Sequence, residues 1–486
     1  MRIIFVHFFF YALGISAVRA QNWADGQSAS YVIGQWAFGT NFSGVYPNEL
    51  DHPDGVVVDP TTGKVFVSDV VNHRVLRYPS ITAMMNEVSG GAEAEAVLGQ
   101  PSLTITYGGA AAGARDIYSP VGLAISATGS LYVVDQKHSR VVRFDHAATI
   151  ATGAAANGVL GQPGFGFAFP VSQTSRSGMF NPSSVFCSGT TLFVSDGGNN
   201  RILRFDNAGS KPNGADADAV LGQSDFNSFS AGDGDTGLNS PAQIYVDGSD
   251  NLWVADRGHN RVLLFPNATA FANDEAATLV LGQKNFTSHF YGTPASSTLK
   301  APSGVYGDAE GNIYVADTHN NRILIFNHAA SLANGSAASC VLGQHNFISD
   351  GVGTSAAQLD RPMALFAGQT LLVADYSNNR VMVYTPLATQ AKVAEDAPGM
   401  AGASGAGPAG LTLYPNPAQH TITLKLPQDG AAAIQVYNSV GHLAFREEVT
   451  GKAVHILHIS RLTAGVYTVR VTQGGHAATG SFIKIN

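Results

Sequence analysis

VADTHNNRILIF, residues 315–326, places one Asp, two Asn and one Arg between two apolar runs. β-branched and aromatic residues favour strands, and Asn tolerates the left-handed backbone that a short turn needs. The stretch therefore predicts a β-hairpin in which Asp317 ends one strand and Arg322 begins the next. Because Asp, His and Arg also serve in catalysis, the meaning of the stretch depends on how often the chain repeats it.

The Asp-x4-Arg element occurs six times with constant internal spacing, at Asp69/Arg74, Asp135/Arg140, Asp196/Arg201, Asp256/Arg261, Asp317/Arg322 and Asp375/Arg380. The sequence VLGQ, or VIGQ in the first copy, also occurs six times, at 32–35, 97–100, 159–162, 220–223, 280–283 and 341–344. A proline precedes each Asp-x4-Arg element: Pro53, Pro120, Pro182, Pro241, Pro302 and Pro362. The copies recur about every 60–65 residues, and such regular internal repetition is typical of repeat architectures.

Each repeat reads as four strands, which after Pro302 are SGVYG, IYVAD, RILIF and CVLGQ. Four antiparallel strands repeated radially form the blade of a β-propeller. The sequence therefore predicts an all-β fold, a six-bladed β-propeller over residues 28–386. The first VIGQ strand has no preceding partners and the last repeat lacks its fourth strand. We therefore expect residues 32–35 to form the outer strand of the sixth blade and to close the ring.

The Pro-x-Gly start, the YVAD strand and the NNRV turn resemble those of NHL repeats, over about residues 30–386. Pro-x-Gly is present in Pro53-Asp54-Gly55, Pro120-Val121-Gly122 and Pro302-Ser303-Gly304 and is lost in the other three repeats. The resemblance implies a six-bladed NHL-type propeller with repeats longer than is usual in the family.

The first twenty residues have the pattern of a secretory signal peptide. Arg2 precedes an apolar run over residues 3–17, and Val18-Arg19-Ala20 provides a cleavage site after Ala20. An uncleaved membrane anchor is the alternative. No other stretch approaches the ~20 apolar residues that a spanning helix requires, so we expect an exported protein without a transmembrane segment in its mature form.

The C-terminal part of the chain forms a separate module. Residues 387–410 are rich in Ala, Gly and Pro and predict a flexible linker. Residues 411–486 alternate short strands with turn residues, which predicts a small C-terminal β-sandwich. Tyr414-Pro415-Asn416-Pro417, Val440-Gly441 and the run from Leu462 to Tyr467 resemble the C-terminal sorting domain of the Bacteroidetes type IX secretion system. This resemblance implies that the type IX machinery is a partner and that the protein is secreted or displayed on the cell surface, whereas an ordinary adhesive sandwich is the alternative.

The six Asp-x4-Arg turns favour a structural role, because one ligand cannot occupy six equivalent positions. Four turns carry a histidine, His73, His138, His259 and His319, at offsets of four, three, three and two from the aspartate. A zinc site needs ligand atoms about 2 Å from the metal. We expect these turns not to bring their histidines together, so we predict solvated turn residues and no metal.

Two further features also favour ordinary structure. AGDGDTG, residues 231–237, has the Asp233 and Asp235 spacing of a calcium loop, but Ile244 stands where the bidentate Glu is expected. We therefore predict a polar surface loop. Cys187 and Cys340 fall on an inner and an outer strand two blades apart, beyond the ~7 Å that a disulfide spans, and we predict two free, buried thiols.

The candidate ligand site lies beside the prolines. First and third strands run in the same sense, so the prolines and the Asp-x4-Arg turns share one face. The residues next to the prolines differ among the repeats and could line an asymmetric polar pocket: His52, Asp54, Ser119, Asn181, Ser240, Gln243 and Arg361.

The leading functional hypothesis is a non-catalytic scaffold that binds an extracellular glycan, peptide or protein through this face, with no cofactor. The alternative is a propeller lyase or hydrolase with a divalent cation, Ca²⁺ or Zn²⁺, at the channel mouth. Nucleic acid binding is disfavoured by export and by the net charge of −8, because neutralising phosphates needs an excess of Lys and Arg.

Overall fold

The computed structural model describes residues 23–86, 91–107, 111–168, 174–387, 412–414, 420–425, 431–438, 443–450, 454–460, 462, 465–473 and 476–484. The chain divides into two compact units, Met1–Ala391 and Lys392–Asn486. The expected signal peptide, and all of the expected linker except Leu387, lie outside the described residues.

The described residues of the first unit form six four-stranded antiparallel sheets, numbered 1 to 6 in chain order. Sheet 1 holds β2 (Pro53–Val58), β3 (Lys64–Asp69), β4 (Arg74–Ser80) and β5 (Ala96–Leu98). Sheet 2 holds β6 (Pro120–Ile125), β7 (Leu131–Asp135), β8 (Arg140–Phe144) and β9 (Gly158–Leu160). Sheet 3 holds β10 (Ser184–Ser188), β11 (Thr191–Asp196), β12 (Arg201–Phe205) and β13 (Ala219–Leu221).

The remaining sheets have the same order. Sheet 4 holds β14 (Pro241–Val246), β15 (Leu252–Asp256), β16 (Arg261–Phe265) and β17 (Leu279–Leu281). Sheet 5 holds β18 (Gly304–Gly307), β19 (Ile313–Asp317), β20 (Arg322–Phe326) and β21 (Cys340–Leu342). Sheet 6 holds β22 (Pro362–Ala367), β23 (Leu371–Asp375), β24 (Arg380–Tyr384) and β1 (Tyr31–Ile33).

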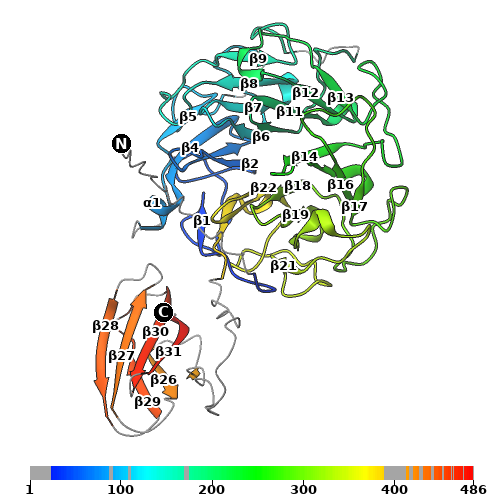
Figure 1. The fold of residues 1–486 in the computed structure, drawn as a ribbon. Coiled ribbons are helices and arrows are strands. Elements are labelled where there is room, and N and C mark those ends of the chain that lie inside the picture. The colour runs from blue at the N-terminus through cyan, green and yellow to red at the C-terminus, as the bar shows by residue number, and fades with distance from the viewer. Residues whose placement is uncertain are drawn as a thin grey trace, which may run out of the picture. The chain divides into compact units, whose positions relative to one another are not determined.

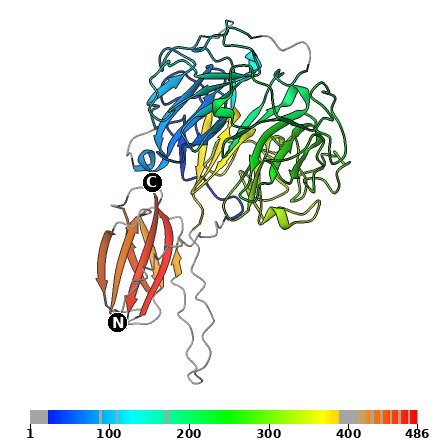
Figure 2. The same ribbon diagram turned by 45° about the horizontal axis from the view of Figure 1, so that its top comes forward.

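The sheets are arranged as a ring around a central axis (Figure 1; Figure 2 turns the same ring). The first strands β2, β6, β10, β14, β18 and β22 are innermost, each in contact with the next, and β22 contacts β2. Sheet 6 is made from both ends of the unit, since β1 pairs antiparallel with β24 through Tyr31↔Val383, Val32↔Met382 and Ile33↔Val381. β1 thus forms the outer strand of sheet 6, and the fold is a β-propeller.

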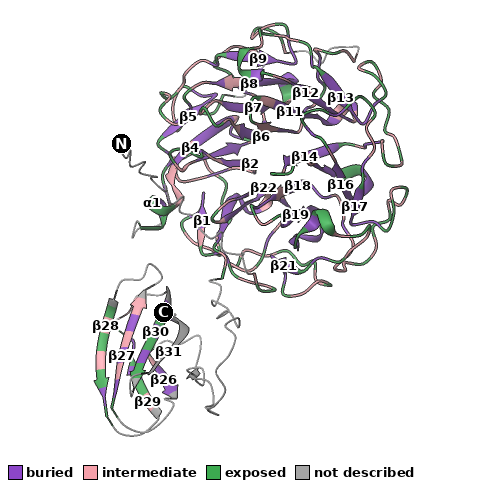
Figure 3. Ribbon diagram, viewed as in Figure 1, coloured by how far each residue is buried: buried purple, intermediate pink, exposed green. Residues whose placement is uncertain are grey.

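The core of the ring lies between neighbouring sheets. Trp253 and Leu264 of sheet 4 belong to the same buried cluster as Val305 and Leu324 of sheet 5. Figure 3 shows the strands as largely buried, with exposed residues concentrated in the connecting loops. Burial on both faces of each sheet explains why the strands carry nearly continuous apolar runs.

Short helices occupy the connections. A single α-helix, α1 (Ile81–Asn86), follows β4 among the described residues. Five 3₁₀ turns join second to third strands: η1 (Gln136–His138), η2 (Gly197–Asn199), η4 (Arg257–His259), η5 (Thr318–Asn320) and η7 (Tyr376–Asn378). Two more, η3 (Ala208–Ser210) and η6 (Ala329–Ser331), follow third strands.

The second unit has two antiparallel sheets. One contains β25 (Thr412–Tyr414), β26 (Thr421–Lys425) and β29 (Val454–His458). The other contains β28 (Leu443–Val449), β27 (Ala432–Asn438), β30 (Gly465–Gln473) and β31 (His476–Lys484). Ile422 and Leu457 of the first sheet share a buried cluster with Ile434 and Val469 of the second. This is the small β-sandwich that the sequence predicts.

Candidate functional site

The Asp-x4-Arg turn at residues 317–322 forms a buried hydrogen-bond network. Asp317 Oδ2 accepts from Arg322 Nε at 2.7 Å and from Asn320 Nδ2 at 2.8 Å, while Asp317 Oδ1 accepts from the N–H of Lys300 at 2.7 Å. Arg322 Nη2 donates to the carbonyls of Ala295 and Thr298. All of the charged atoms of the pair are thus engaged within the fold.

The other five turns repeat this geometry. The Arg Nε to Asp Oδ2 distances are 2.6 Å for Arg74–Asp69, 2.7 Å for Arg140–Asp135, 2.8 Å for Arg201–Asp196, 2.7 Å for Arg261–Asp256 and 2.7 Å for Arg380–Asp375. Every side chain in these pairs is fully buried. Removing one partner of a buried pair leaves an uncompensated charge, which gives the pairs a structural role without any ligand.

The residue before each proline has a left-handed backbone. The φ values are 57° for His52, 54° for Ser119, 45° for Asn181, 50° for Ser240, 47° for Ala301 and 53° for Arg361. At five junctions the backbone N–H of this residue donates to a side chain on the turn of the preceding sheet. The donor and acceptor pairs are His52 to Asn379, Ser119 to His73, Ser240 to Asn200, Ala301 to Asn260 and Arg361 to Asn321. The backbone of the residue before the proline therefore connects neighbouring sheets, independently of its side chain.

Aromatic side chains from four successive inner strands meet across the axis. The ring centroids of Phe186 and Tyr245 are 5.3 Å apart, those of Tyr245 and Tyr306 are 4.7 Å apart, and those of Tyr306 and Phe366 are 5.1 Å apart. The channel has one cavity at the turn face and another at the opposite face, and no residue lines both of them.

On the turn face the channel holds a cavity of about 80 Å³ lined by Asp54, Gln243, Arg257 and other residues. Burial raises the pKa of Asp54 to about 7, and the nearby Arg257 opposes this rise. Gln243 spans the channel: its Nε2 donates to Leu365 O at 2.8 Å, and its Oε1 accepts from the N–H of Val305 and of Leu365. The amide of Gln243 is therefore committed to neighbouring strands.

Close packing of neighbouring inner strands explains the Gly of the Pro-x-Gly motif. A Cβ on Gly304 would lie 2.2 Å from Met363 O, so only Gly allows β18 to approach β22 this closely. Gln243 occupies the equivalent position of sheet 4, where the long side chain crosses the channel instead.

A groove on the turn face lies over sheets 4 to 6. It consists of two hollows of about 570 and 470 Å³ that share Lys300 and His319. Arg257, Ser240 and Tyr291 line the first hollow, and Arg361 and Asp360 line the second. We call this surface the cationic groove.

The charges in the cationic groove are concentrated around His319. Burial lowers the pKa of His319, and Arg257, Arg361 and Lys300 each lower it further. None of the ion pairs found within the described ranges involves these three cations. Lys300 Nζ instead lies 5.7 Å from the centroid of the Tyr291 ring, which is 60% exposed.

The opposite end of the channel opens into a larger hollow of about 1400 Å³, lined by Tyr245, Tyr306 and Glu310 among others. Asp247 and Asp308 also line it, but their oxygens accept hydrogen bonds within their own sheets: Asp247 from Asn251 and Trp253, and Asp308 from Asn312 and Tyr314. Burial and the nearby Asp308 raise the pKa of Glu310. Thr385–Leu387 also line the hollow.

The residues that the sequence predicts for the ligand site lie in different places. Ser240 and Arg361 line the cationic groove, and Asp54 and Gln243 line the channel cavity. His52, Ser119 and Asn181 line none of these cavities. Sequence reasoning missed Arg257, Tyr291, Lys300 and the role of His319. The signal was available, since Lys300 stands two residues before Pro302 and Arg257 directly follows Asp256.

The expectation that the turn histidines are solvated is wrong for two of the four. His138 and His259 are buried, and each Nδ1 lies within hydrogen-bond distance of its turn aspartate, 2.8 Å from Asp135 and 2.9 Å from Asp256. His259 also lies close to Asp233 and His289. A buried carboxylate explains the burial, because it offers the imidazole a partner.

The cysteines are free, as predicted. Cys340 is buried, whereas Cys187 has intermediate exposure, so the expected burial of Cys187 is wrong. Burial raises the pKa of the Cys340 thiol to about 12, with Asp25 adding to the rise.

Family models match both units. The NHL repeat matches residues 50–78 and 299–326, which contain most of the first three strands of sheets 1 and 5. The secretion system C-terminal sorting domain matches residues 412–485. No curated protein sequence matches the chain. Within the described ranges, no helix has both the length and the apolar character needed to cross a bilayer.

Solved structures with a similar fold share little sequence with this chain. A streptogramin B lyase structure is 11% identical, with 74% of this chain and 89% of that chain covered and a TM-score of 0.40. A protein of unknown function from Bacteroides thetaiotaomicron is 13% identical, with 74% and 75% covered and a TM-score of 0.47. The Xanthomonas campestris gluconolactonase XC5397 is 13% identical, with 75% and 100% covered and a TM-score of 0.39. Values this low assign no activity to this chain.

Proposed function

We propose that this NHL-repeat propeller, which its C-terminal sorting domain directs to the medium or the cell surface by type IX secretion, binds an acidic glycan in the cationic groove without chemically changing it. The observation that carries the proposal is the convergence of Arg257, Lys300 and Arg361 around His319.

The charge pattern supports an anionic ligand. Three cations without ion-pair partners sit on one face of a protein whose net charge is −8. Like charges held this close repel one another, and a ligand carboxylate would relieve that repulsion while accepting hydrogen bonds from Lys and Arg. Asp360 lines the second hollow as well, so the first hollow, with Arg257 and Lys300, is the better place for a carboxylate.

Tyr291 favours a glycan over an acidic peptide. Its ring is largely exposed at the wall of the first hollow and carries Lys300 over its face. An exposed aromatic ring offers an apolar surface to the face of a sugar, and the neighbouring ammonium group is then placed to meet an acidic substituent. The hollows together are large enough for several sugar residues, since ligand pockets of about 300–1000 Å³ hold drug-sized molecules.

A hydrolase or lyase at the channel mouth is the second candidate, and Asp54 is the observation that favours it. A carboxyl group whose pKa lies near 7 can donate and accept protons at neutral pH. The cavity that holds Asp54 measures only about 80 Å³, so only a small group of a larger substrate would enter it. This enzyme would use Asp54 as its acid–base group, with the positive charge of Arg257 nearby.

Binding is tested by isothermal titration of the mature chain with polygalacturonate, with neutral dextran and polyglutamate as comparison ligands. We expect binding to polygalacturonate alone and at least a tenfold loss in the Lys300→Ala and Arg361→Ala variants. Lys137→Ala is the matched control, because Lys137 is an exposed cation on the corresponding turn of sheet 2 outside the groove. Preferential binding of polyglutamate would replace the glycan by an acidic peptide, and equal losses in all three variants would refute the groove.

The two candidate functions separate on product formation. If polygalacturonate incubated with the protein were shortened, and Asp54→Asn abolished that shortening, the protein would be an enzyme. Unchanged chain length together with binding supports the scaffold.

A further inference from the structure

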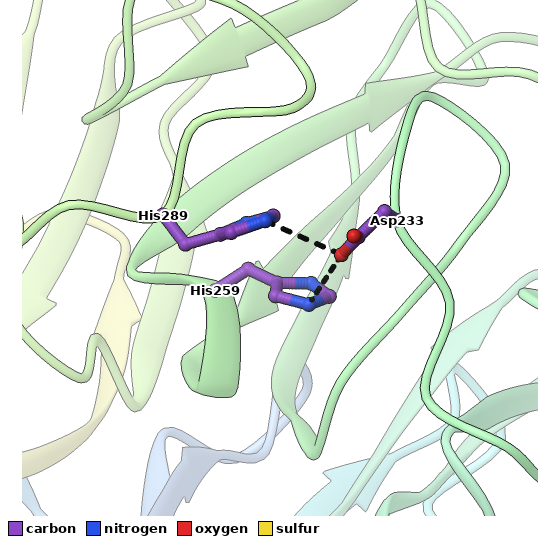
Figure 4. A group of neighbouring side chains, drawn as sticks. All are labelled: Asp233, His259 and His289. Atoms are coloured by element: carbon purple, nitrogen blue, oxygen red, sulfur yellow. Dashed lines mark ion pairs between the residues drawn. The ribbon is translucent and has the colours of Figure 1, made fainter.

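Asp233, His259 and His289 form a cluster of ligand-type atoms (Figure 4). Gly258 and Asn260, the neighbours of His259 in sequence, line the cationic groove. His259 comes from η4 in sheet 4, His289 from the loop after β17, and Asp233 from the loop after β13 of sheet 3. Asp233 Oδ1 lies 3.2 Å from His259 Nε2 and 3.3 Å from His289 Nε2. The two imidazole centroids are 4.5 Å apart.

The second ring nitrogen of His259 is fixed by a buried carboxylate. His259 Nδ1 lies 2.9 Å from Asp256 Oδ2, which is fully buried. An Nδ1–H that donates to this carboxylate leaves the lone pair of neutral His259 on Nε2, directed at Asp233. Metal-binding histidines commonly donate their other N–H to a carboxylate in this way.

This arrangement leaves Asp233 Oδ1 facing two imidazole nitrogens. If both imidazoles are neutral and His259 carries its proton on Nδ1, the closest atoms are two acceptors in contact. A cation among the three atoms resolves this conflict, and so does protonation of the imidazoles. His289 Nδ1 is buried without a hydrogen-bond partner in the described structure, so His289 is not held in place by a second polar contact.

The segments that carry the three side chains are anchored by hydrogen bonds. Arg261 Nη1 donates to Gly234 O at 2.9 Å and Arg261 Nη2 to Gly237 O at 2.8 Å, which holds the loop of Asp233. Asn260 Nδ2 donates to His289 O at 2.9 Å. The cluster is therefore held by the same turn that organises sheet 4.

We propose that Asp233, His259 and His289 bind a zinc ion with one coordination position open to solvent. Zn–N and Zn–O distances of about 2.0–2.2 Å in a tetrahedral site place neighbouring ligand atoms about 3.3–3.5 Å apart. The observed separations of 3.2 and 3.3 Å are close to this length. Two imidazoles favour zinc over Ca²⁺ and Mg²⁺, which prefer oxygen ligands.

The open coordination position of the zinc ion is inferred from the solvent exposure of the ligand side chains. The Asp233 side chain is 69% exposed and that of His289 is 35% exposed, whereas His259 is 7% exposed. Three protein ligands and a solvent-facing fourth position allow the metal to take water or a ligand oxygen. Tyr291, two residues after His289, lines the cationic groove, so an anionic ligand in the groove would lie beside the metal.

Metal binding is tested on the mature chain after chelation and dialysis, with Zn²⁺ titrated in competition with a chromophoric chelator. The spectrum of the Co²⁺-loaded protein reports the coordination geometry. We expect one Zn²⁺ per chain at this site and visible Co²⁺ bands of tetrahedral intensity. Loss of an outer-shell partner typically costs up to about 100-fold in affinity, and we expect His259→Asn and His289→Ala to cost at least that much.

The turns provide a control that preserves the fold. Four of the six turns carry Asn at the position of His259, and its Nδ2 donates to the turn aspartate: Asn72, Asn199, Asn320 and Asn378. His259→Asn should therefore fold, and a circular dichroism melt verifies this. His138→Asn makes the same change in sheet 2, outside the Asp233–His259–His289 cluster, and should leave Zn²⁺ affinity unchanged.

Two outcomes would overturn the proposal. Folded protein that takes up no stoichiometric Zn²⁺ would show that the cluster consists of imidazolium–carboxylate ion pairs. Zn²⁺ affinity that is unaffected by His259→Asn and His289→Ala would place the metal elsewhere in the chain. Neither outcome bears on glycan binding, which is measured separately with Lys300 and Arg361.

Discussion

The side-chain oxygen of Asn321 accepts a hydrogen bond of 2.9 Å from the backbone N–H of Arg361, which joins the turn of sheet 5 to the start of sheet 6. Asn321 has a φ of 53°, and the residue that it binds has the same φ. The Asn321 amide also donates to Asp350 O at 2.8 Å. One turn residue thus holds the next sheet and the loop between the two sheets.

The Asn321 bond predicts a measurable loss of stability. Asn321→Gly keeps the left-handed backbone without strain but removes both side-chain bonds. A typical hydrogen bond contributes about 0.5–1.5 kcal/mol to stability, so we expect the loss of both bonds to cost about 1–3 kcal/mol in urea unfolding. Asn207→Gly is the control, because Asn207 is exposed with a φ of 51° and lies outside the junctions between sheets. Equal losses in both variants would mean that backbone entropy and not the bond is responsible.

The buried Asp317–Arg322 pair predicts a larger loss. Arg322→Met removes the charge that balances Asp317 and frees the carbonyls of Ala295 and Thr298. Breaking a buried pair in this way costs about 3–5 kcal/mol. The exposed Arg257→Met should change stability by less than about 0.5 kcal/mol. A double variant, Asp317→Asn with Arg322→Met, should recover part of the loss because no unpaired charge remains.

Regular features of the ring were predictable from sequence because they repeat. The Asp317–Arg322 spacing, the position of Pro302 and the unpaired first strand each follow from periodicity, so strand order and closure could be inferred without coordinates. The cationic groove could not be inferred in this way. Lys300 lies before the first strand of sheet 5, His319 in the turn of the same sheet and Arg361 before sheet 6, and the three meet only because loops of adjacent sheets fold over one face.

Two further features show the same limit. The sequence predicts a solvated His259 because blade-end turns lie apart, but the long loops after β13 and β17 bring Asp233 and His289 to it. Gln243 remains a predicted ligand-site residue, and the bonds of its amide to Val305 and Leu365 across the channel could not be predicted from the sequence. Loop paths and contacts across the axis depend on tertiary packing, which the residue pattern of a single repeat does not encode.

Closure of sheet 6 predicts that the first strand is essential. Removing residues 23–35 deletes β1 and exposes the edge of β24 along Val381, Met382 and Val383. Unpaired strand edges template association. We expect a strongly lowered melting temperature and concentration-dependent aggregation in light scattering. Removing residues 412–486 is the control, since these residues belong to a separate compact unit. An unchanged melt after loss of β1 would contradict the closure.

Asp54 predicts a pH dependence of stability. Its pKa is about 7 in the folded protein and near the ordinary 3.8 in the unfolded chain. Between these values the folded state binds a proton that the unfolded state lacks, so the contribution of Asp54 to stability falls as pH rises from about 4 to about 7 and then stays constant. Asp54→Asn should therefore raise the melting temperature at pH 8 and have little effect at pH 4. An equal effect at both pH values would show that Asp54 does not titrate in this range.

His319 predicts a pH dependence of ligand binding. Burial, together with Arg257, Arg361 and Lys300, lowers its pKa below the ordinary 6.5, so His319 is neutral at pH 7 in the free protein. A bound carboxylate would favour the imidazolium and raise this pKa, so protons and ligand bind cooperatively. Affinity for polygalacturonate should increase as pH falls from 7 to 5, while the contribution of His319 to the stability of the free protein falls over the same range because the folded protein resists its protonation. His319→Gln should flatten the increase in affinity, whereas His345→Gln, an exposed histidine outside the groove, should preserve it. Affinity that is independent of pH in the wild type would place the ligand away from His319.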